Sequence, residues 1–112
     1  MSLPNAERAV VPPEKVRDYL LSLEHPVGSA KARFFAAPGF RRAEWQVLEA
    51  ALRTHGQTGE AAEGLSPYGR KFEVWGMLQG PGRREAAVVT VWIILRGEDV
   101  PRLVTAFPGV KP

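Results

Sequence analysis

The chain has 112 residues, of which 45% are apolar and 24% charged, and it carries a net charge of +3 and no cysteine. These values are typical of one soluble globular domain, which we assign to residues 1–112. They exclude a disordered chain, a disulfide framework, and zinc–thiolate or cysteine-nucleophile chemistry. The longest apolar run, Val91 to Leu95, is far shorter than a membrane span, and the first residues lack the features of a signal peptide. We therefore expect a cytoplasmic protein with no membrane partner.

The positive charge is unevenly distributed along the chain. Residues 1–64 hold eight basic and eight acidic side chains, whereas residues 65–112 hold seven basic and four acidic ones and so carry the whole +3. Arginine outnumbers lysine eleven to four, and its planar guanidinium group suits phosphates and carboxylates. An anionic partner fits this charge, although +3 is also an ordinary solubility charge for a small domain.

The first half of the chain predicts two or three helices, in a helical part of about residues 12–55. Pro12 and Pro13 favour the start of a helix that runs from about Glu14 to Leu23. The residue before Pro26 is disfavoured in the α conformation, which ends this helix. Its apolar face has the spacing i, i+3, i+4 and i+7 and consists of Val16, Tyr19, Leu20 and Leu23.

Two more helices follow. The second is expected from Ala30 to Ala37, with Ser29 as its N-cap. The third is expected from Arg42 to Thr54, because an aromatic and two leucine side chains recur there at helical spacing. Gly56 is expected to end it in the left-handed conformation. His55, in the last turn, is expected at the surface, where the helix dipole favours it.

The second half of the chain predicts strands, in a strand part of about residues 70–108. Residues 56–69 are rich in Gly, Ser, Thr and Glu, which is typical of turns. A short strand at 9–11 is expected before the helices, and three longer ones at 72–78, 86–95 and 102–107. Helices first and strands second indicate an α+β fold, with two to three N-terminal helices packed on a C-terminal antiparallel sheet of three to five strands.

The chain lacks the common nucleotide and metal signatures: a Walker loop, GxGxxG between strand and helix, GxSxG, HExxH and an EF-hand loop. Its two histidines lie thirty residues apart and its carboxylates show no ligand spacing, so we expect no metal and no cofactor. The remaining polar residues suit metal-free cleavage of a phosphodiester. That reaction needs a base for the 2′-hydroxyl proton, cations for the charge on the phosphorane, and an acid for the leaving 5′-oxygen.

Three candidates for this chemistry lie in the helical part. His25 can act as base or acid, since imidazole titrates near neutral pH, and it can equally cap or pack at a helix end. Lys31 and Arg33 open the second helix just after the loop that carries His25, where the helix N-terminus adds positive potential. A solvated helix face is the commoner setting for such a Lys and Arg pair.

Three further candidates lie in the second half. Arg102 and Thr105 share the last strand, but strict alternation puts residues three apart on opposite faces, so both face one pocket only if a bulge intervenes. Tyr68 lies in the turn before the hairpin, where it offers a hydroxyl or packs its ring over the sheet edge. Trp92 shares a face with Thr90 and is expected in the core.

Blocks of sequence along residues 3–108 resemble a family of small stand-alone bacterial proteins known only as a domain of unknown function. These blocks are Leu-Pro-Asn-Ala-Glu-Arg-Ala-Val-Val (3–11), Lys-Val-Arg-Asp-Tyr-Leu-Leu (15–21), Glu-His-Pro-Val-Gly-Ser-Ala-Lys-Ala-Arg-Phe-Phe (24–35), Gly-Phe (39–40), Ser-Pro-Tyr-Gly (66–69), Val-Trp-Ile (91–93) and Pro-Arg-Leu-Val-Thr-Ala-Phe-Pro (101–108).

A second resemblance is carried by His-Pro-x-Gly-x-x-Lys-Ala (25–32) between two helices and by a closing strand Val-Thr-x-aromatic-Pro (104–108). It is similar to the nuclease domains of contact-dependent and polymorphic bacterial toxins of the barnase–EndoU–colicin–RelE group, in which helices pack on an antiparallel sheet of four or five strands. The resemblance implies an active site with His25, Lys31 and Thr105, with Arg102 and Tyr68 as further members. It also implies an immunity protein or antitoxin that covers the site. Those toxins end the strand in Tyr-Pro, whereas Phe107 has no hydroxyl.

Two functions follow from these observations. The first is a metal-independent endoribonuclease of toxin type, with RNA as substrate and a small acidic antitoxin or immunity protein as partner. Its catalytic residues would be His25, Lys31 and Thr105, and its substrate-binding residues Arg33, Tyr68 and Arg102. The second is a non-catalytic interaction module whose basic sheet half binds an anionic protein or RNA. Convergence of the three catalytic candidates on one cleft favours the first.

Overall fold

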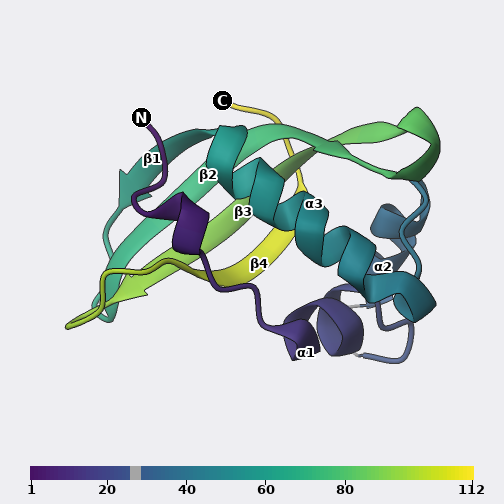
Figure 1. Ribbon diagram of the computed structural model, residues 1–112, viewed down its shortest axis with the longest axis horizontal. Helices are drawn as coiled ribbons and strands as arrows, with labels where there is room; N and C mark the ends of the chain where they lie inside the picture. Colours follow the sequence, from purple (N-terminus) through teal and green to yellow (C-terminus); the bar gives the residue numbers. More distant parts are fainter. Residues whose placement is uncertain (26–28) are drawn as a thin grey trace.

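The computed structural model describes residues 1–25 and 29–112 (Figure 1). Helical segments occupy the first half of the chain and strands the second, so the predicted α+β fold is confirmed. The helical segments are η1 (Ala6–Arg8), α1 (Pro13–Lys15), η2 (Val16–Leu20), α2 (Ser29–Ala36), η3 (Arg42–Glu44) and α3 (Trp45–Thr58). The strands are β1 (Glu60–Gly64), β2 (Gly69–Gln79), β3 (Glu85–Leu95) and β4 (Arg102–Pro108), and the turn η4 (Pro81–Arg83) joins β2 to β3.

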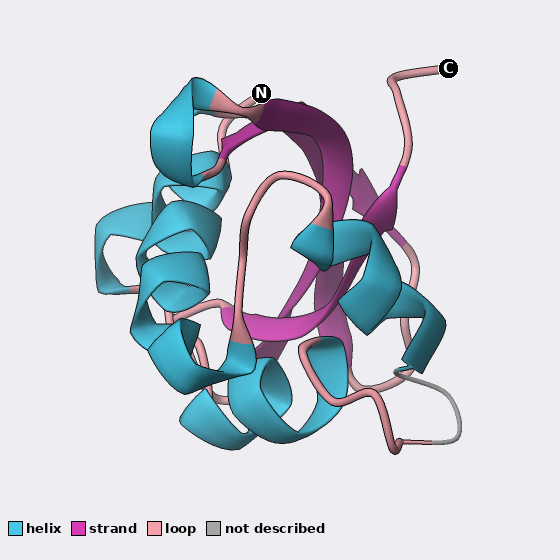
Figure 2. Ribbon diagram, turned by 90° about the vertical axis from the view of Figure 1, so that its right-hand side faces the viewer, coloured by secondary structure: helices cyan, strands magenta, loops and turns pink. Residues whose placement is uncertain are grey.

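The four strands form one antiparallel sheet in the order β1-β2-β3-β4, so that β1 and β4 are its edges. In Figure 2 the curved sheet runs between helices that lie on either side of it. The segment before α1 runs beside the start of β4. There Val10 forms a single parallel bridge with Arg102, so the short strand expected at 9–11 reduces to one bridge. Within the described ranges, no helix combines the length and the apolar character that a membrane span requires.

A β-bulge interrupts the pairing of β3 with β4. Val91 pairs with Thr105, but the next residue of β3 pairs with Leu103, so Val104 has no partner in β3. Arg102 and Thr105 consequently pair with β3 residues that are two apart and share a face. This bulge places the side chains of Arg102 and Thr105 on one side of the sheet.

Helix α3 packs on the inner face of the sheet through Leu48 and Leu52, which are fully buried. The prediction that Gly56 ends this helix is wrong, because α3 continues to Thr58. A Cβ atom at Gly56 would lie 2.8 Å from Cζ2 of the buried Trp92. Glycine therefore stands at this position because the helix approaches the indole ring closely, and not because the chain turns.

His55 is only 2% exposed, so the prediction of a surface position is also wrong. Its Nε2 lies 2.9 Å from the Val88 carbonyl oxygen and 3.1 Å from that of Gly76, and its Nδ1 lies 2.9 Å from Oγ1 of Thr90. Since carbonyls only accept, the partners assign the proton to Nε2, and Nδ1 accepts from the Thr90 hydroxyl. Trp92 Nε1 donates to the same Thr90 oxygen at 2.8 Å. Burial lowers the pKa of His55, although the two backbone bonds act in the opposite direction.

The first predicted helix is shorter than expected. After α1 the chain makes a π-helical turn, η2, and ends it at Leu20 with the Leu21 amide donating to the Val16 carbonyl at 3.0 Å. A π turn is wider than an α turn, so the helical spacing does not continue beyond it. Leu23, which the spacing places on the buried face, is 67% exposed.

Strand β1 lies in the segment where the sequence pattern predicts turns, so the strand part begins at residue 60 rather than about 70. Glu60–Gly64 contains no β-branched or aromatic residue, and only its Ala61 is buried. The strand forms through its backbone, which pairs with β2 on one side, while Met1 exchanges backbone bonds with Ala61 on the other. Strand propensity therefore gives no signal for an exposed edge of this kind.

Candidate active site

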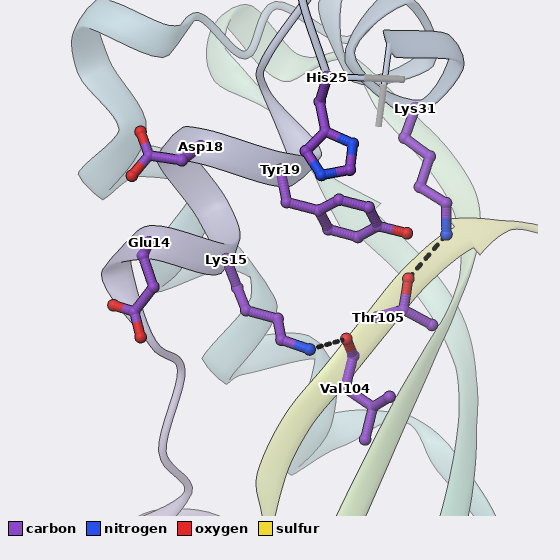
Figure 3. Close-up of a pocket in the computed structure, with 8 residues that line it drawn as sticks. All are labelled: Glu14, Lys15, Asp18, Tyr19, His25, Lys31, Val104 and Thr105. Atoms are coloured by element: carbon purple, nitrogen blue, oxygen red, sulfur yellow. Dashed lines mark hydrogen bonds between the residues drawn. The ribbon is translucent and has the colours of Figure 1, made fainter. Parts of the chain in front are cut away.

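A cleft of about 590 Å³ lies beside β4, between the α1–η2 segment and α2 (Figure 3). The three residues that the sequence predicts as catalytic, His25, Lys31 and Thr105, all line it. Its volume falls in the range of pockets that hold small ligands. The complete lining is Glu14, Lys15, Asp18, Tyr19, His25, Lys31, Val104 and Thr105.

Lys31 extends from the first turn of α2 to the edge strand. Its Nζ donates to Oγ1 of Thr105 at 2.7 Å, and it lies 5.4 Å from the ring centre of Tyr19 and 5.6 Å from that of Phe107. An ammonium group has three N–H donors, so the bond to Thr105 leaves it able to bind an anion. Phe107 presents its ring to the cation here and has no hydroxyl group.

Tyr19 also lines the cleft, although the sequence pattern does not single it out as a site residue. It comes from η2, is half-buried, and directs its hydroxyl group toward Lys31 and Thr105 (Figure 3). A hydrogen bond with Thr105 lowers the pKa of the Tyr19 phenol against the opposing effect of burial, and Lys31 lowers it further. The signal was present in the sequence, because a tyrosine on an apolar helix face needs a partner for its hydroxyl group.

His25 lies beside Tyr19 at the end of the described segment before α2. The two rings meet edge to face, with their centres 5.0 Å apart and their planes at 79°. The His25 carbonyl accepts a bond of 3.0 Å from the Ser29 amide at the start of α2. The middle of the His-Pro-x-Gly string, residues 26–28, lies outside the described residues.

The charges around the cleft are separated. Lys15 donates from Nζ to the carbonyl oxygen of Val104 at 2.7 Å, which satisfies the bulged residue of the edge strand. Asp18 lies on the far side of Tyr19 (Figure 3) and forms ion pairs of 2.9 Å with Arg17 and 3.1 Å with Arg42. The hydrogen bond from Arg17 lowers the pKa of Asp18. The two lysines thus make the side of the cleft next to β4 positive.

A model of the family described as "Domain of unknown function (DUF6883)" matches residues 2–110. The chain belongs to the DUF6883 family. The match covers nearly all of the chain, and it confirms the family resemblance that the sequence blocks carry.

The fold of this DUF6883 chain is also found in a solved structure of a contact-dependent growth inhibition toxin–immunity protein complex from Klebsiella pneumoniae 342. The two chains align with a TM-score of 0.71 over 96% of this chain and 98% of the other, at 14% sequence identity. A comparison with curated proteins finds no match. At this level of identity the structural likeness shows a shared fold.

The three predicted substrate-binding residues lie outside the cleft lining. Arg33 is exposed two residues after Lys31, a spacing that directs the two side chains to different helix faces. Tyr68 is 71% exposed in the β1–β2 turn, so most of its surface faces solvent. Arg102 shares the face of Thr105, but its guanidinium group binds Glu98 at 3.2 Å.

The described part of the chain contains no group of three His, Cys, Asp or Glu side chains that could hold a metal ion. The groups that line the cleft are two ammonium groups, two carboxylates, two hydroxyl groups and an imidazole ring, beside the aromatic ring of Tyr19 and the aliphatic side chain of Val104.

Proposed function

We propose that this DUF6883 chain is an endoribonuclease of bacterial toxin type that cleaves RNA without a metal ion. The observation that carries the proposal is the bond of 2.7 Å between Lys31 Nζ and Thr105 Oγ1 in a cleft that His25 also lines. Residues from three separate parts of the chain thus line one cleft, and they offer a cation, a hydroxyl group and a proton-transfer group.

These groups match the demands of RNA transesterification. The 2′-oxygen attacks phosphorus, negative charge builds up on the non-bridging oxygens, and the 5′-oxygen leaves with a proton. Lys31 provides positive charge at the phosphorane, and Thr105 holds the ammonium group in place. His25 supplies proton transfer, because an imidazole ring nitrogen can donate or accept a proton.

The rest of the cleft supports a nucleotide ligand. The rings of Tyr19 and His25 give aromatic surface on which a base of single-stranded RNA can stack. The two lysines attract the phosphate backbone. We place the action of the protein in the cytoplasm, where its substrate is found.

A protein inhibitor is part of the proposal, since an unrestrained ribonuclease harms the cell that makes it. The fold shared with a chain of a toxin–immunity protein complex supports such a partner. We propose a small acidic immunity protein or antitoxin, because the chain carries a net charge of +3 and the cleft is positive next to β4.

The test is incubation of the purified chain with total tRNA and mRNA in the presence of EDTA, beside the variants His25→Ala and Lys31→Met. Lys71→Met is the matched control, because Lys71 is an exposed lysine on β2 that does not line the cleft. The wild type and the control should give discrete fragments that end in 2′,3′-cyclic phosphates. Each cleft variant should lose about 100-fold or more in rate.

Other outcomes have clear meanings. Intact RNA in the presence of wild-type protein contradicts the proposed function, and RNA binding without cleavage, weakened steeply by salt, then indicates a non-catalytic RNA-binding module. Equal fragmentation by all variants indicates a contaminating nuclease.

A further inference from the structure

We propose that Tyr19 is the catalytic base of this cleft, and that its phenolate oxygen takes the proton of the attacking 2′-hydroxyl group. The inference rests on the endoribonuclease function proposed above. It assigns the abstraction of the 2′-hydroxyl proton to Tyr19, which the sequence pattern places only on the apolar face of a helix.

The geometry that supports this role is a cluster of three groups. Lys31 donates to Thr105 at 2.7 Å, and the Tyr19 hydroxyl group points toward both of them (Figure 3). An ammonium group close to a phenol oxygen favours negative charge on that oxygen. The pKa of the Tyr19 phenol is lowered accordingly, first by the hydrogen bond with Thr105 and then by Lys31 and Lys15.

The other charged groups around the cleft are placed for different roles. Lys15 is bonded to the carbonyl oxygen of Val104. The carboxylates of Glu14 and Asp18 lie on the opposite side of the ring from its hydroxyl group (Figure 3), and Asp18 is held by two arginines. Within the described residues of the lining, Tyr19 and His25 are therefore the pair suited to proton transfer.

The position of the phenol oxygen decides which of the two is the base. It lies beside Lys31, the cation that binds the phosphate, so it is also beside the 2′-oxygen that attacks the same phosphorus atom. His25 packs against the edge of the Tyr19 ring, 5.0 Å between centres, and is displaced from the Lys31–Thr105 pair (Figure 3). That displacement suits the leaving group, which departs on the opposite side of phosphorus from the attacking oxygen.

The reaction step balances with these two groups. The 2′-hydroxyl proton passes to the Tyr19 phenolate as the bond between the 2′-oxygen and phosphorus forms. The bond between phosphorus and the 5′-oxygen breaks, and the His25 imidazolium gives its proton to that oxygen. The products are a 2′,3′-cyclic phosphate and a 5′-hydroxyl end, and water returns Tyr19 and His25 to their starting protonation states.

The first experiment is Tyr19→Phe, which removes the oxygen and keeps the ring. Cleavage should fall by about 10²- to 10⁴-fold, the range for loss of a general base. Binding of a 2′-methoxy RNA, which cannot be cleaved, should be unchanged. A variant that cleaves at the wild-type rate overturns the assignment.

The second experiment distinguishes a base from a residue that only positions others. Site-specific replacement of Tyr19 by a fluorinated tyrosine makes the phenol more acidic, so the rise of kcat with pH should move to lower pH. If the rise stays at the same pH while Tyr19→Phe is inactive, Tyr19 is a positioning residue and the proposal is wrong.

A third measurement does not require activity. In a Tyr68→Phe background, Tyr19 is the remaining tyrosine, and its ionisation can be followed by ultraviolet absorbance. Lys31→Met should raise the midpoint of this titration, whereas Lys71→Met should leave it in place. A midpoint that does not respond to Lys31 removes the basis for the assignment. Failure of the wild type to cleave RNA refutes the ribonuclease function even where this titration behaves as expected.

Discussion

Replacing Thr90 by valine tests the buried polar cluster under α3. Thr90 is completely buried, and its hydroxyl group serves two other buried side chains: it accepts from Trp92 Nε1 at 2.8 Å and donates to His55 Nδ1 at 2.9 Å. Valine has nearly the same shape, so the substitution removes the hydrogen bonds and leaves the packing intact. The Trp92 Nε1–H group and the His55 Nδ1 atom then stay buried without a hydrogen-bond partner on that side.

The expected cost follows from the two unsatisfied groups. A buried donor or acceptor that loses its partner costs about 1–3 kcal/mol, so Thr90→Val should lower the free energy of unfolding by about 2–6 kcal/mol. A chain of 112 residues has a total of roughly 6–17 kcal/mol at about 0.05–0.15 kcal/mol per residue, so the loss is a large share of it. Thr90→Ser keeps the hydroxyl group and removes one methyl group, and should cost only about 1 kcal/mol.

The assay is urea unfolding followed by tryptophan fluorescence and by circular dichroism, for the wild type and both variants. The unfolding midpoints should decrease in the order wild type, Thr90→Ser, Thr90→Val. A valine variant as stable as the serine variant would refute the reasoning, because it would show that the hydroxyl group contributes no more than the methyl group.

Two further predictions concern the same layer of the core. Burial lowers the pKa of His55 in the folded chain, so below the unfolded value of about 6.5 the unfolded chain binds more protons. The stability that the neutral His55 side chain provides should therefore be present well above that pH and be lost as the pH decreases from 7 toward 5. In urea titrations the variant His25→Ala should show the same loss, because the loss belongs to His55. An unfolding midpoint independent of pH would contradict this prediction. Gly56→Ala should lower the free energy of unfolding by about 1–3 kcal/mol through overpacking against Trp92, and higher helix propensity should restore about 1 kcal/mol of this loss. Gly64→Ala, with nothing within 4 Å of the new Cβ, should change the thermal midpoint little; equal effects at both glycines would exclude the steric explanation.

The parts of the fold that could be predicted from sequence are those whose side chains decide their structure. Strands β2, β3 and β4 lie within a few residues of their predicted ranges, because β-branched and aromatic residues favour a pleated, half-buried surface. The sequence pattern gives no signal for β1, since the pairing of this strand depends on the backbone of β2. It places the end of α3 too early because Gly56 can signal a helix end or a close contact, and only the position of Trp92 distinguishes the two.

The candidate site was predicted in part for a similar reason. His25 and Lys31 lie around a predicted helix start, Thr105 is indicated by the resemblance of its strand to that of the toxin nucleases, and the structure brings all three to one cleft. Tyr19 was counted with the apolar face because helical spacing identifies the side of a helix, but gives no indication of what its hydroxyl group meets. The roles of these residues stay predictions until cleavage is measured.

The bond between Lys31 and Thr105 joins positions 74 residues apart. The described helices from α1 to α3 and the first three strands precede β4 in the chain, so a nascent or truncated polypeptide that stops before Arg102 contains Tyr19 and Lys31 but lacks Thr105, to which Lys31 binds. The strand that completes the cleft is therefore the last of the four strands to be made. Under the proposed function, a partly made chain does not yet hold the catalytic cleft.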